Sequence, residues 1–214
     1  DFAKAMDYHT RSLKIYEELG DKNKIAHSLV SIGNIYYHQG NYAKAIEYYT
    51  RSLKIFEEFG GKKNIATTLN NIGSVYNEQG KNAKAIDYHT RSLIIFKKIG
   101  DKEGISASLS NIGNIHKSQG ELVKALDYYT KSLKINEETG NKKNIAKSLN
   151  SIGATYYYQG DYHKAMDKCT ESLSIAQEIG NTLQIKDASK SLWKVHKKLG
   201  KHRQALEMHE LYIQ

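Results

Sequence analysis

The apolar positions of this chain follow a helical spacing that recurs every 40 residues. Ile25, Leu29, Ile32 and Tyr36 are separated by steps of three or four residues, which places them on one face of an α-helix over residues 25–39. A second helix is predicted over residues 42–58, and we expect its apolar face to be broader because it packs against its own partner and against the next pair. The apolar positions of this second helix are Tyr42, Ala45, Ile46, Tyr49, Leu53 and Phe56.

Glycine residues predict where the helices end. Both glycine columns suit the left-handed residue just past a helix end, where a side chain would clash. The column after the first helices is Gly40, Gly80, Gly120, Gly160 and Gly200, and the column after the second helices is Gly20, Gly60, Gly100, Gly140 and Gly180. The polar residues that follow are expected to be N-caps, namely Asp21, Asp101, Asn141 and Asn181.

A fixed period of this size predicts a stack of one helix-pair unit, in which each copy buries its apolar face against its neighbours. We therefore predict an all-α solenoid of about 11 helices without strands, and a single domain over residues 1–214. Its parts are an orphan second helix at 1–20, full repeats at 21–60, 61–100, 101–140 and 141–180, and a divergent terminal repeat at 181–214. Because the chain begins and stops inside a unit, we interpret it as a piece of a longer protein.

The residues of the repeat resemble the tetratricopeptide repeat in its 40-residue variety. The matching positions in one copy are Leu29, Ile32, Gly33, Tyr36, Gly40, Tyr42, Ala45, Tyr49 and Leu53. The resemblance covers the whole chain and implies a right-handed superhelix of antiparallel helix pairs. Two departures are a longer unit and glycine where the family usually ends in proline. The longer form is similar to repeats of spindle-orientation adaptors, kinesin light chains and bacterial peptide-responsive regulators.

The last repeat departs from the others. Trp193 stands where the other copies have glycine, and Ser189 stands where they have leucine. Trp193 is interpreted either as a cap on the end of the stack or as an anchor for a partner. The ending "ALEMHELYI" resembles the final repeats of bacterial membrane-bound sensor kinases and cyclases. This resemblance gives an alternative function, the sensory input region of a transmembrane signalling enzyme.

In the tetratricopeptide family the first helices line a concave groove that binds a protein or peptide, and the resemblance implies the same here. The implied groove positions vary between repeats while the core positions barely change. They are His27, Val30, Asn34, Tyr37, His38, Thr67, Asn70, Ser74, Asn77, Ser110, Asn114, Lys117, Lys147, Asn150, Tyr157, Tyr158, Lys190 and Lys194.

The groove chemistry favours an extended and acidic ligand. Asn34, Asn70, Asn114 and Asn150 each carry a donor and an acceptor, which suits a peptide backbone. Lysines outnumber acidic residues at these positions, and the chain has a formal net charge of +9. We therefore expect an acidic peptide or a C-terminal carboxylate to lie with its negative end near the groove lysines of the last repeat. The alternative is that these polar residues form a merely solvated surface.

Other functions are weighed against the repeat pattern. No phosphate loop, nucleophile elbow or kinase signature occurs, so we expect neither an enzyme nor a bound cofactor. One column of the second helices could suggest a metal site, but successive helix layers lie on the order of 10 Å apart, so we predict core packing and no metal. This column is His9, Tyr49, His89, Tyr129, Cys169 and His209.

Nucleic acid is a second alternative ligand, because tyrosines lie near lysines, but the four arginines are scattered and no base-reading code recurs. No apolar run is long enough to span a membrane, so no membrane contact is expected within this segment. The compartment is not indicated; cytoplasm is the default and periplasm follows if the chain belongs to a membrane sensor. The apolar flank of the helix at 2–19 would allow two copies to self-associate.

Overall fold

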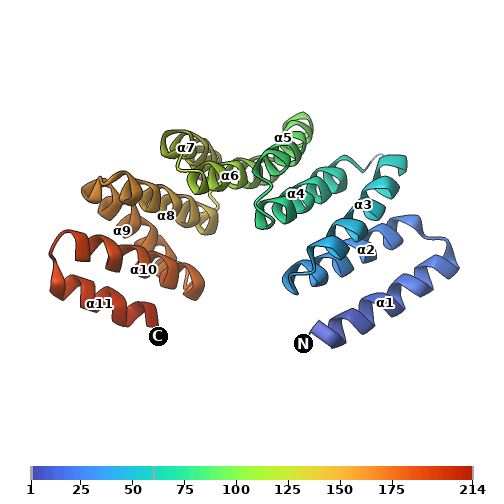
Figure 1. Cartoon of the computed structure of the whole chain (residues 1–214), viewed down its shortest axis with the longest axis horizontal. Coiled ribbons are helices and arrows are strands. Elements are labelled where there is room, and N and C mark those ends of the chain that lie inside the picture. The colour runs from blue at the N-terminus through green and yellow to red at the C-terminus, as the bar shows by residue number, and fades with distance from the viewer. Residues whose placement is uncertain (1, 60, 214) are drawn as a thin grey trace. The chain divides into compact units, whose positions relative to one another are not determined.

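The computed structural model describes residues 2–59 and 61–213, and all of their regular secondary structure is helical (Figure 1). The eleven helices predicted from the spacing are present in these residues, so the all-α fold class is confirmed. The helices are α1 Phe2–Leu19, α2 Lys22–His38, α3 Tyr42–Phe59, α4 Lys62–Glu78, α5 Asn82–Ile99, α6 Lys102–Ser118, α7 Leu122–Glu138, α8 Lys142–Gln159, α9 Tyr162–Glu178, α10 Thr182–Lys198 and α11 His202–Ile213.

The chain divides into two compact units, and the division falls inside α6, between Asn111 and Ile112. In the first unit, α2 packs on α3 and α4 on α5, while α1 packs on α2. In the second unit, α8 packs on α9 and α10 on α11, and α10 also contacts both α8 and α9. Each unit is thus built from helix pairs that pack against their neighbours along the chain.

The helix ends follow the predicted chemistry. Nine glycines have φ between 64° and 85°, which is the left-handed region. Gly60, which the sequence places in the same column, lies outside the described residues. The predicted N-caps are confirmed: the side chains of Asp21, Asp101, Asn141 and Asn181 each accept a hydrogen bond from the backbone N–H three residues later.

The core is built from equivalent residues of successive repeats. Ala45, Ala85, Ala125 and Ala165 are fully buried on the second helices, and the leucine and isoleucine stripes of the first helices are buried against them. Each buried leucine or isoleucine contributes roughly 1.5–3 kcal/mol. A polar bond also recurs: Ser52, Ser92 and Ser172 donate to the carbonyl of the alanine 26 residues earlier, at 2.7 to 2.8 Å. These hydroxyls tie the two helices of a pair together.

Four of the six residues in the column that could suggest a metal site are core residues in the structure, whereas His9 and His209 at its ends are half-buried. Tyr49, His89, Tyr129 and Cys169 are at most 2% exposed. Each lies against a glycine of the first helix, where an added Cβ would come within 2.4 to 2.8 Å of the partner side chain. The glycine column at Gly33, Gly73, Gly113 and Gly153 therefore lets the two helices of each pair approach closely. Burial raises the pKa of the Cys169 thiol to about 12, so this cysteine is a packed thiol.

Candidate peptide-binding surface

The residues that the sequence assigns to a ligand groove lie on α2, α4, α6, α8 and α10, the first helices of their pairs. None of the eighteen is buried, whereas the core residues beside them, such as Leu29 and Ile32, are 1% and 2% exposed. A ligand can therefore reach these side chains within each unit. Their role in binding stays a prediction.

The aromatic groove residues are already packed against one another. The ring of Tyr37 lies 5.3 Å from that of His38 and 6.1 Å from that of Tyr42. In the second unit, Tyr157 lies 5.6 Å from both Tyr158 and Tyr162. Burial, and secondarily the carboxylate of Glu78, raises the pKa of Tyr37. These rings form small aromatic walls at equivalent places in the first and fourth full repeats.

A pocket of about 350 Å³ lies between α4 and α6 in the first unit. Three predicted groove residues line it, namely Thr67, Asn70 and Ser74. The remaining lining residues are Lys63, Asn71, Phe96, Asp101, Glu103, Gly104, Ala107 and Asn111. The lining combines the Phe96 ring and aliphatic carbon with amide and hydroxyl groups, so it suits a ligand that offers an apolar side chain together with backbone-like donors and acceptors.

Gly104 allows this pocket to take its shape. The other full repeats carry Lys24, Asn64 and Asn144 at the same position. A Cβ on Gly104 would come within 2.3 Å of the Phe96 ring, so a side chain here requires that ring to move. Phe96 consequently reaches the pocket wall from α5.

An ion pair closes one rim of the pocket. Lys63 Nζ lies 2.8 Å from an Asp101 carboxylate oxygen, and only 13% of the Asp101 side chain is exposed. The hydrogen bond from Lys63 lowers the pKa of Asp101, and the backbone N–H of Gly104 adds to this effect. The same carboxylate caps α6, so the pair links that helix end to α4.

The groove asparagines are fixed by the buried column of the second helices. The hydroxyls of Tyr49 and Tyr129 donate to the side-chain oxygens of Asn34 and Asn114, each at 2.6 Å. In the intervening repeat, His89 Nδ1 lies 2.6 Å from the Asn70 oxygen, and we assign the proton to Nδ1. The Cys169 thiol approaches the Asn150 oxygen at 3.7 Å. Each of these four asparagines thus uses its acceptor internally.

This pattern alternates between repeats. A tyrosine reaches the asparagine directly after the close-contact glycine, as in Asn34 and Asn114. The smaller His89 and Cys169 meet an asparagine one turn earlier, at Asn70 and Asn150. The NH2 group of Asn70 donates to Ser108 at 3.1 Å, while those of Asn34 and Asn114 have no partner within the described ranges. Their two donors remain available to a ligand.

The second unit has an aromatic and cationic pocket between α8 and α10. It has a volume of about 350 Å³ and is lined by Tyr157, Trp193, Lys194, Lys197 and Lys198. A smaller pocket of about 40 Å³ shares Tyr157 and Lys194 with it and reaches the buried Cys169. Lys194, which the sequence assigns to the groove, therefore lines both pockets.

Trp193 packs on the last helix and also faces a pocket, while its role as an anchor for a partner stays a prediction. Its ring lies 4.8 Å from that of His209 and 6.4 Å from that of Tyr212, so it packs on α11. It also forms a wall of the second-unit pocket. Ser189, the other divergent residue, is fully buried, and its hydroxyl has no hydrogen-bond partner among the described residues.

Comparison with known sequences identifies the repeat. Residues 1–58 and 64–138 match one profile described as tetratricopeptide repeat, and residues 145–179 match a second profile with the same description. The chain belongs to the tetratricopeptide repeat family. A search of curated proteins finds no match to the chain.

Solved structures with low sequence identity share this tetratricopeptide-type fold. BtubC (BKLC) from P. vanneervenii has a TM-score of 0.84 at 17% identity, over 97% of this chain and 88% of that chain. A Rap protein complexed with Competence and Sporulation Factor has a TM-score of 0.77 at 20% identity, over 90% of this chain and 53% of that chain. The Rap conjugation gene regulator of plasmid pLS20, in complex with the Phr* peptide, has a TM-score of 0.77 at 19% identity.

That second Rap match covers 92% of this chain and 55% of the regulator, so the present chain spans about half the length of either Rap protein. At these identities the likeness shows the fold alone. Within the described tetratricopeptide repeats, no helix is both long enough and apolar enough to cross a membrane.

Sequence reasoning missed several residues of the first-unit pocket. Asn71 and Asn111 line it, but they occupy a column that is serine in the other repeats and was not assigned to the groove. The change from serine to asparagine in two neighbouring tetratricopeptide repeats was the available signal. The contribution of Phe96 could not be read from its column, because Phe56 stands at the same position.

Proposed function

We propose that this chain is a protein-binding tetratricopeptide-repeat scaffold that holds an extended peptide against the first helices of its pairs. The orientation of the groove asparagines carries the proposal. Because the buried tyrosines occupy the acceptors of Asn34 and Asn114, each carboxamide is held in place and keeps two donors for a ligand. The carbonyl groups of an extended peptide are suitable acceptors for such donors.

The relatives of known structure support this proposal. The Rap regulator of plasmid pLS20 is complexed with the Phr* peptide, and another Rap protein is complexed with Competence and Sporulation Factor. Both share the helix-pair architecture of this chain. The proposed role is binding rather than catalysis.

The test is a selection of random linear peptides displayed against the full chain, followed by affinity measurements. Asn34→Asp and Asn114→Asp each keep an oxygen for the tyrosine hydroxyl but replace the NH2 donors with an acceptor. We expect the selected peptides to bind these variants about tenfold or more weakly, which corresponds to about 1.4 kcal/mol per factor of ten.

Gln177→Glu is the matched control, because it makes the same change of charge on an exposed residue of α9, a second helix. This variant should bind the selected peptides as the native chain does. Equal binding by all four proteins would show that the peptides do not use the groove asparagines. Failure to select any peptide would likewise contradict the proposal.

A further inference from the structure

Helix α10 carries a stripe of positive charge on the groove side of the last repeat. Lys186, Lys190, Lys194 and Lys198 follow one another at intervals of four residues, and Lys197 lies beside them. Residues four apart are neighbours on a helix surface, so like charges at this spacing repel and destabilise the helix. Asp187 is the sole acidic residue of α10. The helix dipole favours Lys197 and Lys198 in the last turn, but Lys186 and Lys190 lie too far from that end to benefit.

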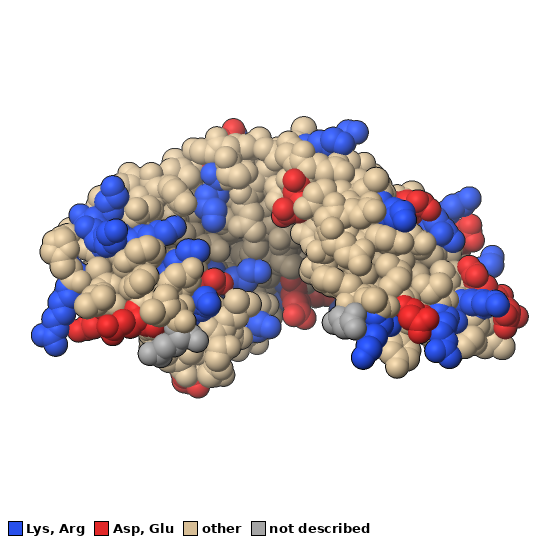
Figure 2. Space-filling model, turned by 60° about the horizontal axis from the view of Figure 1, so that its bottom comes forward, with Lys and Arg blue, Asp and Glu red and all other residues tan. Residues whose placement is uncertain are grey.

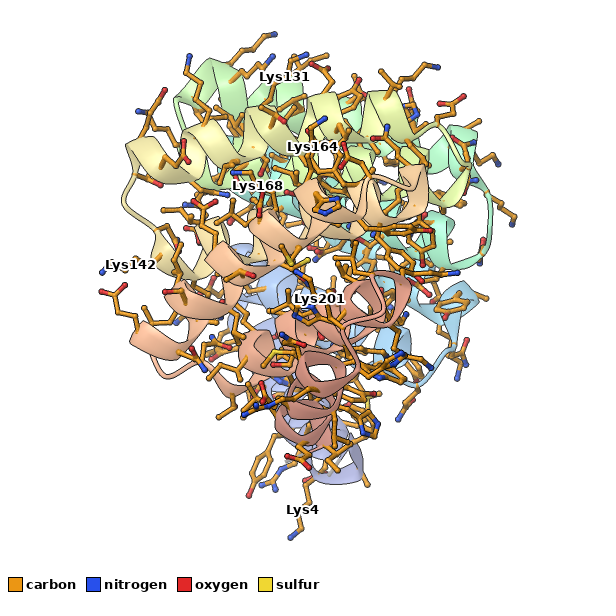
Figure 3. All side chains as sticks on the ribbon, turned by 90° about the vertical axis from the view of Figure 1, so that its left-hand side faces the viewer. Lys4, Lys131, Lys142, Lys164, Lys168 and Lys201 are labelled. Atoms are coloured by element: carbon orange, nitrogen blue, oxygen red, sulfur yellow. The ribbon has the colours of Figure 1, made fainter. Side chains whose placement is uncertain are left out.

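The stripe also lacks the ion pairs that other lysines of the second unit make. Lys131, Lys142, Lys164 and Lys168 on α7, α8 and α9 each pair with a carboxylate (Figure 3). None of the five lysines of α10 has a carboxylate within 4.0 Å among the residues that the structure describes. Figure 2 shows acidic side chains interspersed with basic ones on the face in view. Single lysines of the second unit such as Lys134 and Lys147 also lack an ion pair within the described part of the chain, so α10 is distinguished by carrying five such lysines on one helix.

Three of these lysines converge on the second-unit pocket. Lys194, Lys197 and Lys198 line it together with Tyr157 and Trp193, and Lys197 Nζ lies 5.3 Å from the centre of the Trp193 ring. The pocket therefore joins three ammonium groups to aromatic walls. Three positive charges exceed what one carboxylate neutralises, whereas a phosphoryl group carries about −1.5 to −2 at neutral pH.

We propose that the second-unit pocket binds a doubly charged anionic group of an extended peptide, supplied by a phosphorylated side chain or by two adjacent carboxylates. Lys194, Lys197 and Lys198 neutralise the anion, while Tyr157 and Trp193 contact the apolar residue beside it. This assignment rests on the proposed function, because it takes the ligand to be a peptide lying along the first helices. A single-stranded nucleic acid is disfavoured, because the pocket holds one anionic group rather than a track for a backbone.

Trp193 provides the measurement, since it is the single tryptophan of the chain and forms a wall of the pocket. Its fluorescence should change saturably when the full chain is titrated with a synthetic Gly-Ser peptide that contains phosphoserine next to phenylalanine. A second peptide carries Asp-Asp in place of the phosphoserine, and a third carries Ser-Ser. We expect the first two to bind and the third not to bind, with affinity falling as NaCl rises from about 0.05 to 0.3 M.

Lys194→Gln and Lys198→Gln should each weaken binding of the anionic peptides about three- to tenfold. The matched control is Lys134→Gln, which removes an exposed lysine of α7 and leaves the pocket intact. Circular dichroism verifies that each variant is folded. The tighter of the two anionic peptides identifies the source of the charge.

Three results would overturn the assignment. The Ser-Ser peptide could bind as tightly as the phosphopeptide, or Lys134→Gln could weaken binding as much as Lys194→Gln. Polyuridylate could displace the peptide and bind in a manner that depends on Lys194, which would make the ligand a nucleic acid. Under either of the first two results, library-selected peptides could still bind Asn34→Asp and Asn114→Asp more weakly than the native chain. Failure of the anion pocket is therefore distinguishable from failure of the groove.

Discussion

At the residue scale, the second helix of each full repeat buries a tyrosine, histidine or cysteine against the close-contact glycine, and the first helix supplies its asparagine partner. The size of the buried group decides where that asparagine stands. Repeat 21–60 combines Val30, Asn34 and Tyr49, whereas repeat 61–100 combines Asn70, Ser74 and His89. The three positions therefore behave as a matched set.

Exchanging one set for the other tests this coupling. His89→Tyr alone leaves the new tyrosine hydroxyl without an asparagine acceptor, because repeat 61–100 has Ser74 at the position of Asn34. It also leaves the Asn70 oxygen without its bond to the imidazole, so we expect the unfolding free energy to fall by about 1–3 kcal/mol. Adding Asn70→Val and Ser74→Asn should restore stability to within about 1 kcal/mol of the native chain. Urea denaturation measures both. Equal midpoints for the single and triple variants would refute the matched set.

His89 also predicts how stability depends on pH. Burial lowers the pKa of His89 from 6.5 to about 4, so between these values the unfolded chain binds more protons than the folded chain. The contribution of His89 is therefore complete above pH 6.5 and is lost as the pH falls toward 4. We expect a loss of about 2 kcal/mol between pH 7 and pH 5.

Urea unfolding at the two pH values measures this loss. In the triple variant, tyrosine replaces the titrating group, so most of the difference should disappear. An unchanged difference would assign the acid sensitivity to other groups.

At the element scale, the close approach of each helix pair depends on the absence of a side chain at one glycine. An added Cβ on Gly113 would lie 2.8 Å from the Tyr129 ring across the α6–α7 contact. We expect Gly113→Ala to destabilise the chain by about 1–3 kcal/mol, although alanine is favoured over glycine in a helix by about 1 kcal/mol.

A double-mutant cycle separates packing from helix preference. In a Tyr129→Ala background the ring is gone, so Gly113→Ala should become neutral or stabilising. Chemical denaturation of the four proteins gives the coupling energy. Additive effects would show that the glycine is not required by the ring.

The positions and ends of the helices could largely be predicted from the sequence, because they depend on residues close together in the chain. Helix ends follow from glycines and capping residues that act within a few positions of themselves, as at Asp21 and Gly40. The first-unit pocket could not be predicted in the same way. It depends on Gly104 and Phe96 from different helices and on asparagines in a column that is serine in the other repeats. Such pockets follow from tertiary packing rather than from spacing.

The last pair shows how linked replacements mark a change of packing. Trp193 replaces the close-contact glycine, Lys186 replaces a buried alanine, and Tyr212 replaces the serine that bonds to it in other repeats. Lys186 Nζ now lies 5.5 Å from the Tyr212 ring, and Trp193 packs on His209. The sequence indicated the divergence of Trp193, while its partners on α11 required the structure.

At the scale of the whole molecule, the sequence predicts one domain whose stability is shared between repeats. If so, calorimetry should show a single unfolding peak, with a van't Hoff enthalpy equal to the calorimetric enthalpy. Gly113→Ala should lower the midpoint of that single peak. Two separate peaks, with only one moved by the substitution, would show that the units divided at α6 unfold independently.

The asparagine bonds of the full repeats have a consequence for how such a chain changes over generations. The bond that each asparagine oxygen accepts closes inside a single block of 40 residues, as Tyr49 does with Asn34 and Cys169 with Asn150. A gene that duplicates or deletes a whole block therefore disturbs none of these bonds in the blocks that remain. The number of blocks can therefore change while these internal bonds are kept, and only the bonds that join neighbouring blocks, such as Asn70 to Ser108, must be made anew.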